Sequence, residues 1–393
     1  MLVGMMGAFR NPPELAKITS LICTNYGIEL VYLRPNDIDI ETGTATGKLF
    51  VNNEWVKKET EIPQFIDINP YNFKKRNREV TKYLKNKTFL SDNRKKPLSK
   101  RAFQEALEKD PKYKDYVIPT YDVKSYEDIK THAATYPKFV LKPAGGIQGK
   151  GVYIVEKIDD KFKVGHYTEE NHFNEDEMKD FYYENIDGKK FILQKYVSSK
   201  TLQGDPFDCR IHLEKNGEGK WQIAKKYIRI GIGQKVISNT NQGGGIADVK
   251  QFLEANYGTQ WKAINKKLDD LGAIIPYKIE KLRDTHIMSL GIDVGIDRDG
   301  KLYIFEANDR PATKPIVSEV AYLRSNYYKY VFDHTLGIKE NTKKEEDEKY
   351  TALAKERDFY KKEYDKVKSS TSWRLSAPVR KLSELKDKLY KNR

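Results

Sequence analysis

A lysine at the end of an apolar strand, followed by a glycine-rich loop, is the feature of this sequence best suited to binding phosphate. Residues 139–155 carry it, and Lys142 ends the first strand-like run. Glycines permit positive φ and let backbone N–H groups approach phosphate oxygens, while the lysine can reach α- and β-phosphates as a point charge. The spacing is neither a P-loop nor a Rossmann fingerprint. An ordinary glycine-rich hairpin is the structural alternative. The loop glycines are Gly145, Gly146, Gly149 and Gly151.

Two carboxylates and an amide form a second constellation, in residues 291–311. Glu306 and Asn308 are two apart on a strand-like run, so they share one face, and a hairpin through Asp299-Gly300 can bring Asp293 alongside them. Such oxygen ligands suit Mg²⁺ that bridges nucleotide phosphates. The apolar neighbours imply partial burial, where an unpaired carboxylate is costly. A bound metal would offset that cost, and so would a salt bridge to Arg310 or Lys142.

Two arginines within strand-like sequence, Arg210 and Arg229, are candidates for contacting phosphate or carboxylate oxygens. A structural salt bridge is the alternative for each. Asn239, shortly before a run of three glycines, predicts a polar loop over a reaction centre. His212 shares a face with Arg210, but we expect it to be a hydrogen-bonded structural residue and not a catalyst.

The elements that must position these residues begin with a small α/β unit. We expect strands at 2–6, 28–33 and 64–68, a helix over 12–26, and a hairpin over 48–56 that turns at Asn52-Asn53. The start of the chain is too short an apolar stretch for a secretory signal. Residues 89 to about 335 alternate strands, glycine-rich turns and helices. The expected strands there are 139–142, 152–155, 191–196, 209–214, 221–230 and 302–306, and the expected helices are 251–268 and 276–289.

A change of composition to Lys, Glu and Tyr marks the C-terminal part from about residue 340. Tyr350 to Val367 has 3-4 spacing, which predicts either a short coiled coil or a solvated surface helix. The basic segment 373–389 has helical spacing that could rest on a membrane surface or a partner. We therefore expect three domains: 1–88, an N-terminal α/β domain; 89–335, the main domain; and 336–393, a charged helical tail.

The order of these motifs resembles the ATP-grasp superfamily, over residues from about 90 to 320. Within it, the sequence is similar to the ribosomal-protein-S6 glutamate-ligase type and to the spore-coat-associated, YheC/YheD-like branch. The pieces that carry the resemblance are Gly145 to Val152, Asp208-Cys-Arg210, Ser238-Asn239 before its glycines, and Glu306-Ala-Asn308. The opening domain, with Trp55 before residues 62–67, also looks like the spore-coat branch.

The resemblance implies an α+β (α/β) ATP-grasp fold, preceded by a pre-ATP-grasp domain, that holds a nucleotide between two subdomains. Lys142 and a second lysine would contact the nucleotide. The second lysine is Lys100, with Lys95 and Lys96 as alternatives. Arg210, Arg229 and Asn239 would steady the transferring phosphoryl group. Asp293, Glu306 and Asn308 would hold one or two Mg²⁺. The adenine would contact the backbone of Gln194, Lys195, Tyr196 and Val197. Relatives often carry an acidic residue where Lys195 stands.

The activity that the resemblance implies is ligation of a carboxylate to an amine through an acyl-phosphate, with ATP and Mg²⁺. The sequence offers no obvious Ser-His-Asp or Cys-His set, and this chemistry needs none. Two alternatives stay open: a nucleotide-binding scaffold without turnover, and an ATP-grasp kinase that phosphorylates a hydroxyl group. Residues 369–380 resemble terminal segments of bacterial surface-polysaccharide glycosyltransferases, which suggests an acidic polysaccharide acceptor and a role in polysaccharide biosynthesis.

Composition limits the partners and the compartment. The formal net charge is +14, but no zinc-finger, RNP-type or helix-turn-helix pattern accompanies it, so we expect no nucleic acid. Two cysteines without metal-type spacing favour a reducing compartment. No apolar run approaches the roughly 20 residues of a membrane span. We expect a cytoplasmic protein, with peripheral membrane attachment, a protein partner or a homo-oligomer as open alternatives.

Overall fold

The computed structural model describes residues 1–94, 96, 98–145, 151–166, 169–232, 244–338 and 342–369. The chain divides into two compact units, Met1–Gly337 and Ile338–Arg393. The described part of the first unit holds three β-sheets and their covering helices. The expected division into three domains stays a proposal. No described helix is long and apolar enough to cross a membrane.

The N-terminal sheet has the order β3-β4-β2-β1-β6-β7, with β5 paired to β4. Its central strands are parallel, and β1 lies between β2 and β6. Asn52 and Asn53 adopt φ of 49° and 66°, the left-handed conformation that a tight hairpin turn needs. The strands, helix and hairpin expected before residue 69 are confirmed. The elements are β1 (Leu2–Met6), α1 (Glu14–Thr24), β2 (Glu29–Leu33), β3 (Ile38–Asp39), β4 (Thr44–Val51), β5 (Glu54–Glu61), β6 (Phe65–Ile68), α2 (Arg78–Lys87) and β7 (Phe89–Leu90).

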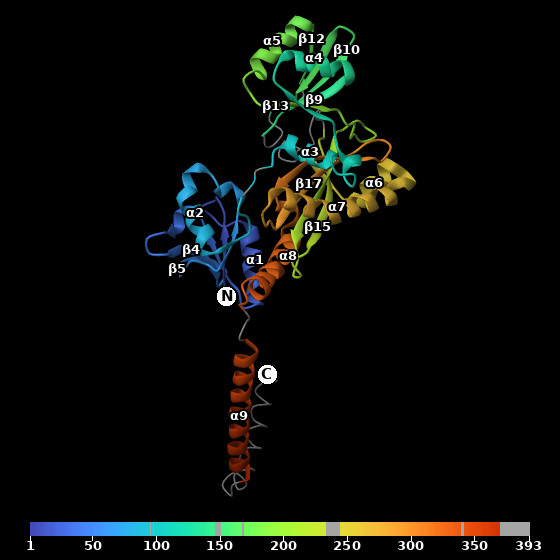
Figure 1. The fold of residues 1–393 in the computed structure, drawn as a ribbon. Helices are drawn as coiled ribbons and strands as arrows, with labels where there is room; N and C mark the ends of the chain where they lie inside the picture. The colour runs from blue at the N-terminus through green and yellow to red at the C-terminus, as the bar shows by residue number, and fades with distance from the viewer. Residues whose placement is uncertain are drawn as a thin grey trace, which may run out of the picture. The chain divides into compact units, whose positions relative to one another are not determined.

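A second sheet, antiparallel throughout, has the order β12-β11-β10-β9-β13-β8. Helices α4 and α5 pack on it through a core that includes Ile129, Phe139 and Met178 (Figure 1). The helix α3 precedes this sheet in the chain. The elements are α3 (Lys100–Glu108), β8 (Thr120–Val123), α4 (Tyr126–Thr135), β9 (Lys138–Pro143), β10 (Tyr153–Ile158), β11 (Lys161–His166), β12 (Glu169–Phe173), α5 (Glu175–Asn185) and β13 (Phe191–Lys195).

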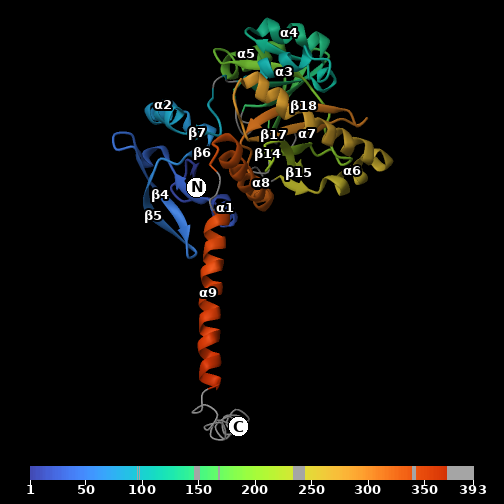
Figure 2. The ribbon, with the colours of Figure 1, turned by 60° about the horizontal axis from the view of Figure 1, so that its bottom comes forward.

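The third sheet, also antiparallel, has the order β16-β15-β14-β17-β18. Residues Cys209, Ile211 and Leu213 of β14 enter the core shared with α6 and α7. Because strand side chains alternate, Arg210, His212 and their even-numbered neighbours point to the opposite face. Figure 2 shows α6 and α7 beside β14 and β15. The elements are β14 (Phe207–Lys215), β15 (Trp221–Ile230), β16 (Gly245–Ala247), α6 (Val249–Tyr257), α7 (Trp261–Arg283), β17 (Ser289–Ile296), β18 (Leu302–Asp309) and α8 (Val317–Tyr330).

The two expected helices of this region were wrong in their boundaries. Gly258, with φ of 52°, ends α6, and α7 then runs without a break through Pro276. A proline inside a helix removes one hydrogen bond and crowds the carbonyl four residues earlier. For this reason Pro276 was expected at the start of a helix and not within one. The buried stripe Leu268, Leu271, Ile275 and Ile279 holds the helix across that position. Ser289, expected in the second helix, begins β17 instead.

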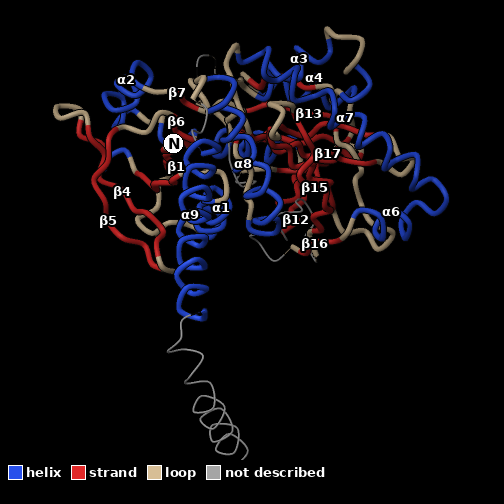
Figure 3. The backbone as a smooth tube through the Cα atoms, turned by 90° about the horizontal axis from the view of Figure 1, so that it is seen from below, coloured by secondary structure: helices blue, strands red, loops and turns tan. Residues whose placement is uncertain are grey.

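Helix α8 packs against α1 and brings the third sheet next to the N-terminal sheet. Tyr328 of α8 meets Phe65 of β6 edge-on, with ring centroids 5.3 Å apart. Figure 3 shows α1 and α8 between the strands of the two sheets. Cys23 of α1 and Cys209 of β14 are both fully buried free thiols.

The second unit contains the helix α9 (Thr342–Ser369). Phe359 and Tyr360 are exposed on it. The expected seam from Tyr350 to Val367 therefore falls on a helix, while the coiled coil stays a prediction. The basic segment 373–389 lies outside the described residues.

Candidate functional site

Lys142 stands near the end of β9, where its ammonium group meets a neutral amide. Its Nζ donates a hydrogen bond to Oε1 of Gln194 on the neighbouring strand β13, at 2.7 Å. Nε2 of Gln194 donates in turn to Oγ1 of Thr120 at 2.9 Å. Burial lowers the pKa of Lys142 to about 8; Lys100 lowers it too, while Glu306 acts in the opposite direction. Among the described residues no carboxylate forms an ion pair with Lys142, and such a poorly solvated cation is well placed to receive an anion.

Asp293, Glu306 and Asn308 come together on β17 and β18, as the hairpin predicted. Asp293 pairs directly with Glu306 in the register of the two strands, and a bulge follows Asp293. Nδ2 of Asn308 donates to Oδ2 of Asp293 and to Oε1 of Glu306, each at 3.0 Å. The turn between the strands contains Gly300 at φ of 73°.

Arg210 and Arg229 both pair with Asp293. Nη2 of Arg210 donates to Oδ2 of Asp293 at 3.0 Å, and Nη2 of Arg229 lies 2.9 Å from the same oxygen. Nε of Arg229 also donates to Asp208 at 2.7 Å. Burial opposes ionisation of Asp293, but the two guanidinium groups prevail and hold its pKa at about 2. The salt-bridge alternative thus describes the contacts of both arginines, and those contacts lie within the predicted site.

Lys100 forms an ion pair with one of these acids. It begins α3, which Ser99 caps by accepting a hydrogen bond from the backbone N–H of Ala102. Nζ of Lys100 lies 2.9 Å from Oε2 of Glu306. Lys96, in contrast, pairs with Asp284 at 3.8 Å. Lys95 lies outside the described residues.

The glycine loop and the polar loop are described only at their edges. Gly151 adopts φ of 71°, a left-handed conformation that glycine takes readily. A Cβ added at Gly145 would meet nothing within 4 Å. Gly146, Gly149 and Asn239 lie outside the described residues, so their predicted roles stay predictions.

The segment expected to contact adenine, Gln194 to Val197, covers the end of β13 and the two residues after it. Part of its backbone already forms hydrogen bonds within the protein. The N–H of Lys195 donates to the carbonyl of Pro119 at 3.0 Å, and that of Tyr196 donates to the carbonyl of Lys138 at 3.2 Å. The side chain of Lys195 is exposed. Val197 accepts from the N–H of Ser199 at 3.0 Å. The predicted adenine contacts of Gln194 to Val197 stay a prediction. Sequence reasoning missed the side chain of Gln194 as a partner of Lys142, because nothing local in the sequence marks that contact.

The donor chemistry fits MgATP. Among the described residues, no group of three or more His, Cys, Asp or Glu is placed to hold a metal ion. The set present is two carboxylates and an amide that contact one another, which is the oxygen-rich and incomplete set that Mg²⁺ shares with nucleotide phosphates. The cations Lys100 and Lys142 flank it.

A nucleotide-suited site between two antiparallel sheets, one supplying lysine and the other acids and arginines, defines an ATP-grasp protein. More narrowly, the chain belongs to the YheC/D like ATP-grasp family, whose model matches residues 92–336. The expected resemblance and fold class are thereby confirmed. ATP with Mg²⁺ is consistent with this membership.

Two curated relatives come from Bacillus subtilis (strain 168). The endospore coat-associated protein YheD is 26% identical over 288 residues, which cover 70% of this chain and 63% of YheD. The endospore coat-associated protein YheC is 22% identical over 305 residues, covering 74% of this chain and 83% of YheC. Thus the match spans less than two thirds of YheD. Among solved structures, N5-carboxyaminoimidazole synthetase from Staphylococcus aureus with ADP is 13% identical, with a TM-score of 0.48, covering 83% of this chain and 77% of that one.

Proposed function

We propose that this chain is an ATP- and Mg²⁺-dependent ligase that joins a carboxylate to an amine. The observation that carries the proposal is the meeting of Lys100 with Glu306, next to Lys142 and to the cluster around Asp293. Cations and oxygen ligands in one place suit a triphosphate, and family membership supports the same reading.

In the proposed reaction, an oxygen of the substrate carboxylate attacks the γ-phosphorus of ATP, and the bond to the β-phosphate oxygen breaks. The products of this step are ADP and an acyl-phosphate. The amine then attacks the acyl carbon and loses a proton, and inorganic phosphate leaves as the amide forms. Asp293, Glu306 and Asn308 would hold Mg²⁺, which would supply positive charge to offset the charge of the phosphates during the transfer.

The residues of this chain act by position and charge. Lys142 and Lys100 hold the phosphates, and Arg210 and Arg229 stand where the transferring group would pass. These arginines are pre-oriented by Asp293 and Asp208, so little side-chain entropy is lost when an anion arrives. Asn239 is proposed for the same region.

The acceptor is the finer part of the proposal. An amino acid or amine attached to an acidic sugar of a surface polymer is the version suggested by residues 369–380. Incubation with ATP, uronic-acid glycans and an amino-acid panel tests that version, and the absence of any condensation with a uronate would remove it without touching the ligase proposal.

A mass-spectrometric acceptor screen with parallel measurement of ADP release tests the reaction class. A ligase releases ADP and adds an acyl bond to the acceptor. A kinase adds a phosphate, and a scaffold gives neither product. A folded protein that ignores adenine nucleotides in excess Mg²⁺ would overturn the proposed function itself.

A further inference from the structure

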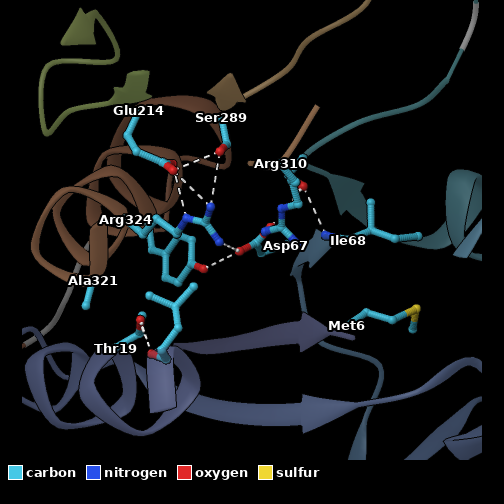
Figure 4. Close-up of polar contacts among 12 residues, drawn as sticks. Met6, Thr19, Asp67, Ile68, Glu214, Ser289, Arg310, Ala321 and Arg324 are labelled. Carbon is cyan, nitrogen blue, oxygen red and sulfur yellow. Dashed lines mark hydrogen bonds and ion pairs between the residues drawn. The ribbon is translucent and has the colours of Figure 1, made fainter. Parts of the chain in front are cut away.

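A buried group of charges lies away from the proposed nucleotide contacts, where the N-terminal sheet meets α8. At its centre is Asp67 of β6, whose side chain is 0% exposed. It forms an ion pair with Arg310, receives a hydrogen bond from the Tyr328 hydroxyl at 2.6 Å, and contacts Nη1 of Arg324 at 3.5 Å. Figure 4 shows Asp67 between Arg310 and Arg324.

The same group continues into the third sheet. Nη2 of Arg324 donates to Oε1 of Glu214 at 2.9 Å and to the hydroxyl of Ser289 at 3.2 Å. The network therefore holds two carboxylates, Asp67 and Glu214, and two guanidinium groups, and its charge is balanced. Side-chain exposure is 11% for Arg310 and 3% for Arg324, so each charge depends on the others for solvation.

Arg310 connects this network to the proposed metal site. It follows Asn308 by two residues and adopts φ of 50°, a left-handed conformation that an arginine rarely takes. The chain turns there, and Pro311 packs over Gly291 of β17 so closely that a Cβ at Gly291 would lie 2.6 Å from that of Pro311. Asp67 thus contacts Arg310, at the start of the connection from β18 to α8, and also Arg324 and Tyr328 within α8 itself.

A stabilising role alone is a weak explanation for this arrangement. Replacing a buried ion pair by apolar residues of similar volume is often neutral for stability, whereas a fixed geometry needs specific partners. The pair holds the corner at which the strand that carries Glu306 and Asn308 ends. Groups that hydrogen-bond to metal ligands orient those ligands, and this pair would do so one step further away, through the backbone at the end of β18.

We propose that Asp67 is a positioning residue: through Arg310 it fixes the end of β18, so that Glu306 and Asn308 stay directed at the metal that accompanies the nucleotide. The N-terminal sheet thereby takes part in metal binding without touching the metal. This inference rests on the proposed function.

The test compares nucleotide binding with and without metal in full-length variants. Asp67→Asn/Arg310→Met removes the pair without leaving a lone charge. Glu214→Gln is the matched control, because it removes one buried carboxylate of the same network that contacts Arg324 and not Arg310. Isothermal titration calorimetry gives ADP affinity in excess Mg²⁺ and in EDTA, and thermal melts report folding.

We expect the double variant to fold and to bind ADP in EDTA like the wild type, while the gain in affinity from Mg²⁺ falls about tenfold, as for other groups behind metal ligands. Glu214→Gln is expected to melt at a lower temperature than the wild type and to keep the full gain in ADP affinity from Mg²⁺. The inference would be overturned if Mg²⁺ raised the ADP affinity of the double variant as much as that of the wild type. It would also be overturned if Glu214→Gln lost as much of this increase as the double variant.

A third variant keeps the test decisive if the double variant does not fold. Tyr328→Phe removes one hydrogen bond to Asp67 and is expected to reduce the Mg²⁺ gain by a smaller factor. An unchanged gain in that variant would then count against the inference. Failure of the wild type to bind ADP at all would instead refute the proposed function.

Discussion

Nζ of Lys100, at the start of α3, lies 2.9 Å from Oε2 of Glu306 on β18. This pair joins the segment that leads into the second sheet to the acid-bearing strand of the third sheet. Both side chains are partly exposed, at 24% and 31%, so ligand atoms can reach them.

Glu306→Ala should abolish magnesium-dependent turnover and leave the fold intact. Loss of a group that helps to stabilise developing charge typically lowers the rate by about 100-fold or more. Because the Glu306 side chain is partly exposed, the free energy of unfolding should change little. ADP release and a thermal melt measure the two effects. Glu105→Ala, which removes a carboxylate paired with Arg101 on α3, is the control. Near-normal turnover in Glu306→Ala would show that the site is misassigned.

Nucleotide affinity should fall as the pH rises above about 8. Burial lowers the pKa of Lys142 from 10.5 to about 8, so the ammonium form that binds phosphate is lost above that pH, by up to about tenfold per pH unit. The unfolded chain keeps this proton up to about pH 10.5, so the ligand-free fold should also gain stability between these values.

The measurement is an ADP titration in EDTA from pH 7 to 10. Lys142→Met should bind weakly at every pH and lose the dependence. A flat affinity in the wild type would separate Lys142 from nucleotide binding.

Arg210→Met should destabilise the fold by about 3–5 kcal/mol at pH 7, because removing one partner leaves the charge of Asp293 buried. Burial raises the pKa of Asp293, and the arginines lower it to about 2. The contribution of Asp293 to stability is therefore complete above about pH 4 and lost toward pH 2. In the variant the folded-state pKa of Asp293 should rise toward or above its unfolded value, so the loss of stability between pH 4 and pH 2 should shrink or reverse. Urea titrations across this range measure it.

The control for that experiment is Arg34→Met. Arg34 pairs with Asp37 at 2.7 Å, but its side chain is 38% exposed, so the cost should stay below about 1 kcal/mol. Equal losses in the two variants would contradict the burial argument.

Gly291→Ala should destabilise the protein by about 1–3 kcal/mol, the usual cost of overfilling a packed interior. Its Cβ would lie 2.6 Å from Cβ of Pro311 and 3.2 Å from Cδ of Arg210. Gly145→Ala is the stability control, since its Cβ would meet nothing within 4 Å. Chemical unfolding measures both variants, and similar values for the two would refute the packing argument.

Local patterns predicted the hairpin of the site, because strand alternation and the Asp299-Gly300 turn decide which side chains share a face. In that hairpin Asp293 lies opposite Glu306, while the exact register and the bulge after Asp293 were not predicted. Pro276 misled the same reasoning, since burial along α7 outweighs one lost hydrogen bond. Local patterns could not show the partners that strand neighbours supply, such as Gln194 beside Lys142. Nor could they show Asp67, whose partners depend on how α8 meets the first sheet.

The two buried cysteines have a practical consequence for studying this protein. Burial raises the pKa of Cys23 and of Cys209 to about 12, so neither thiol supplies much thiolate at neutral pH. A cysteine introduced at an exposed position, such as Tyr183 on α5, would therefore react first with a maleimide dye. Fluorescent reporters of ligand binding can be attached in this way while both natural cysteines stay in place.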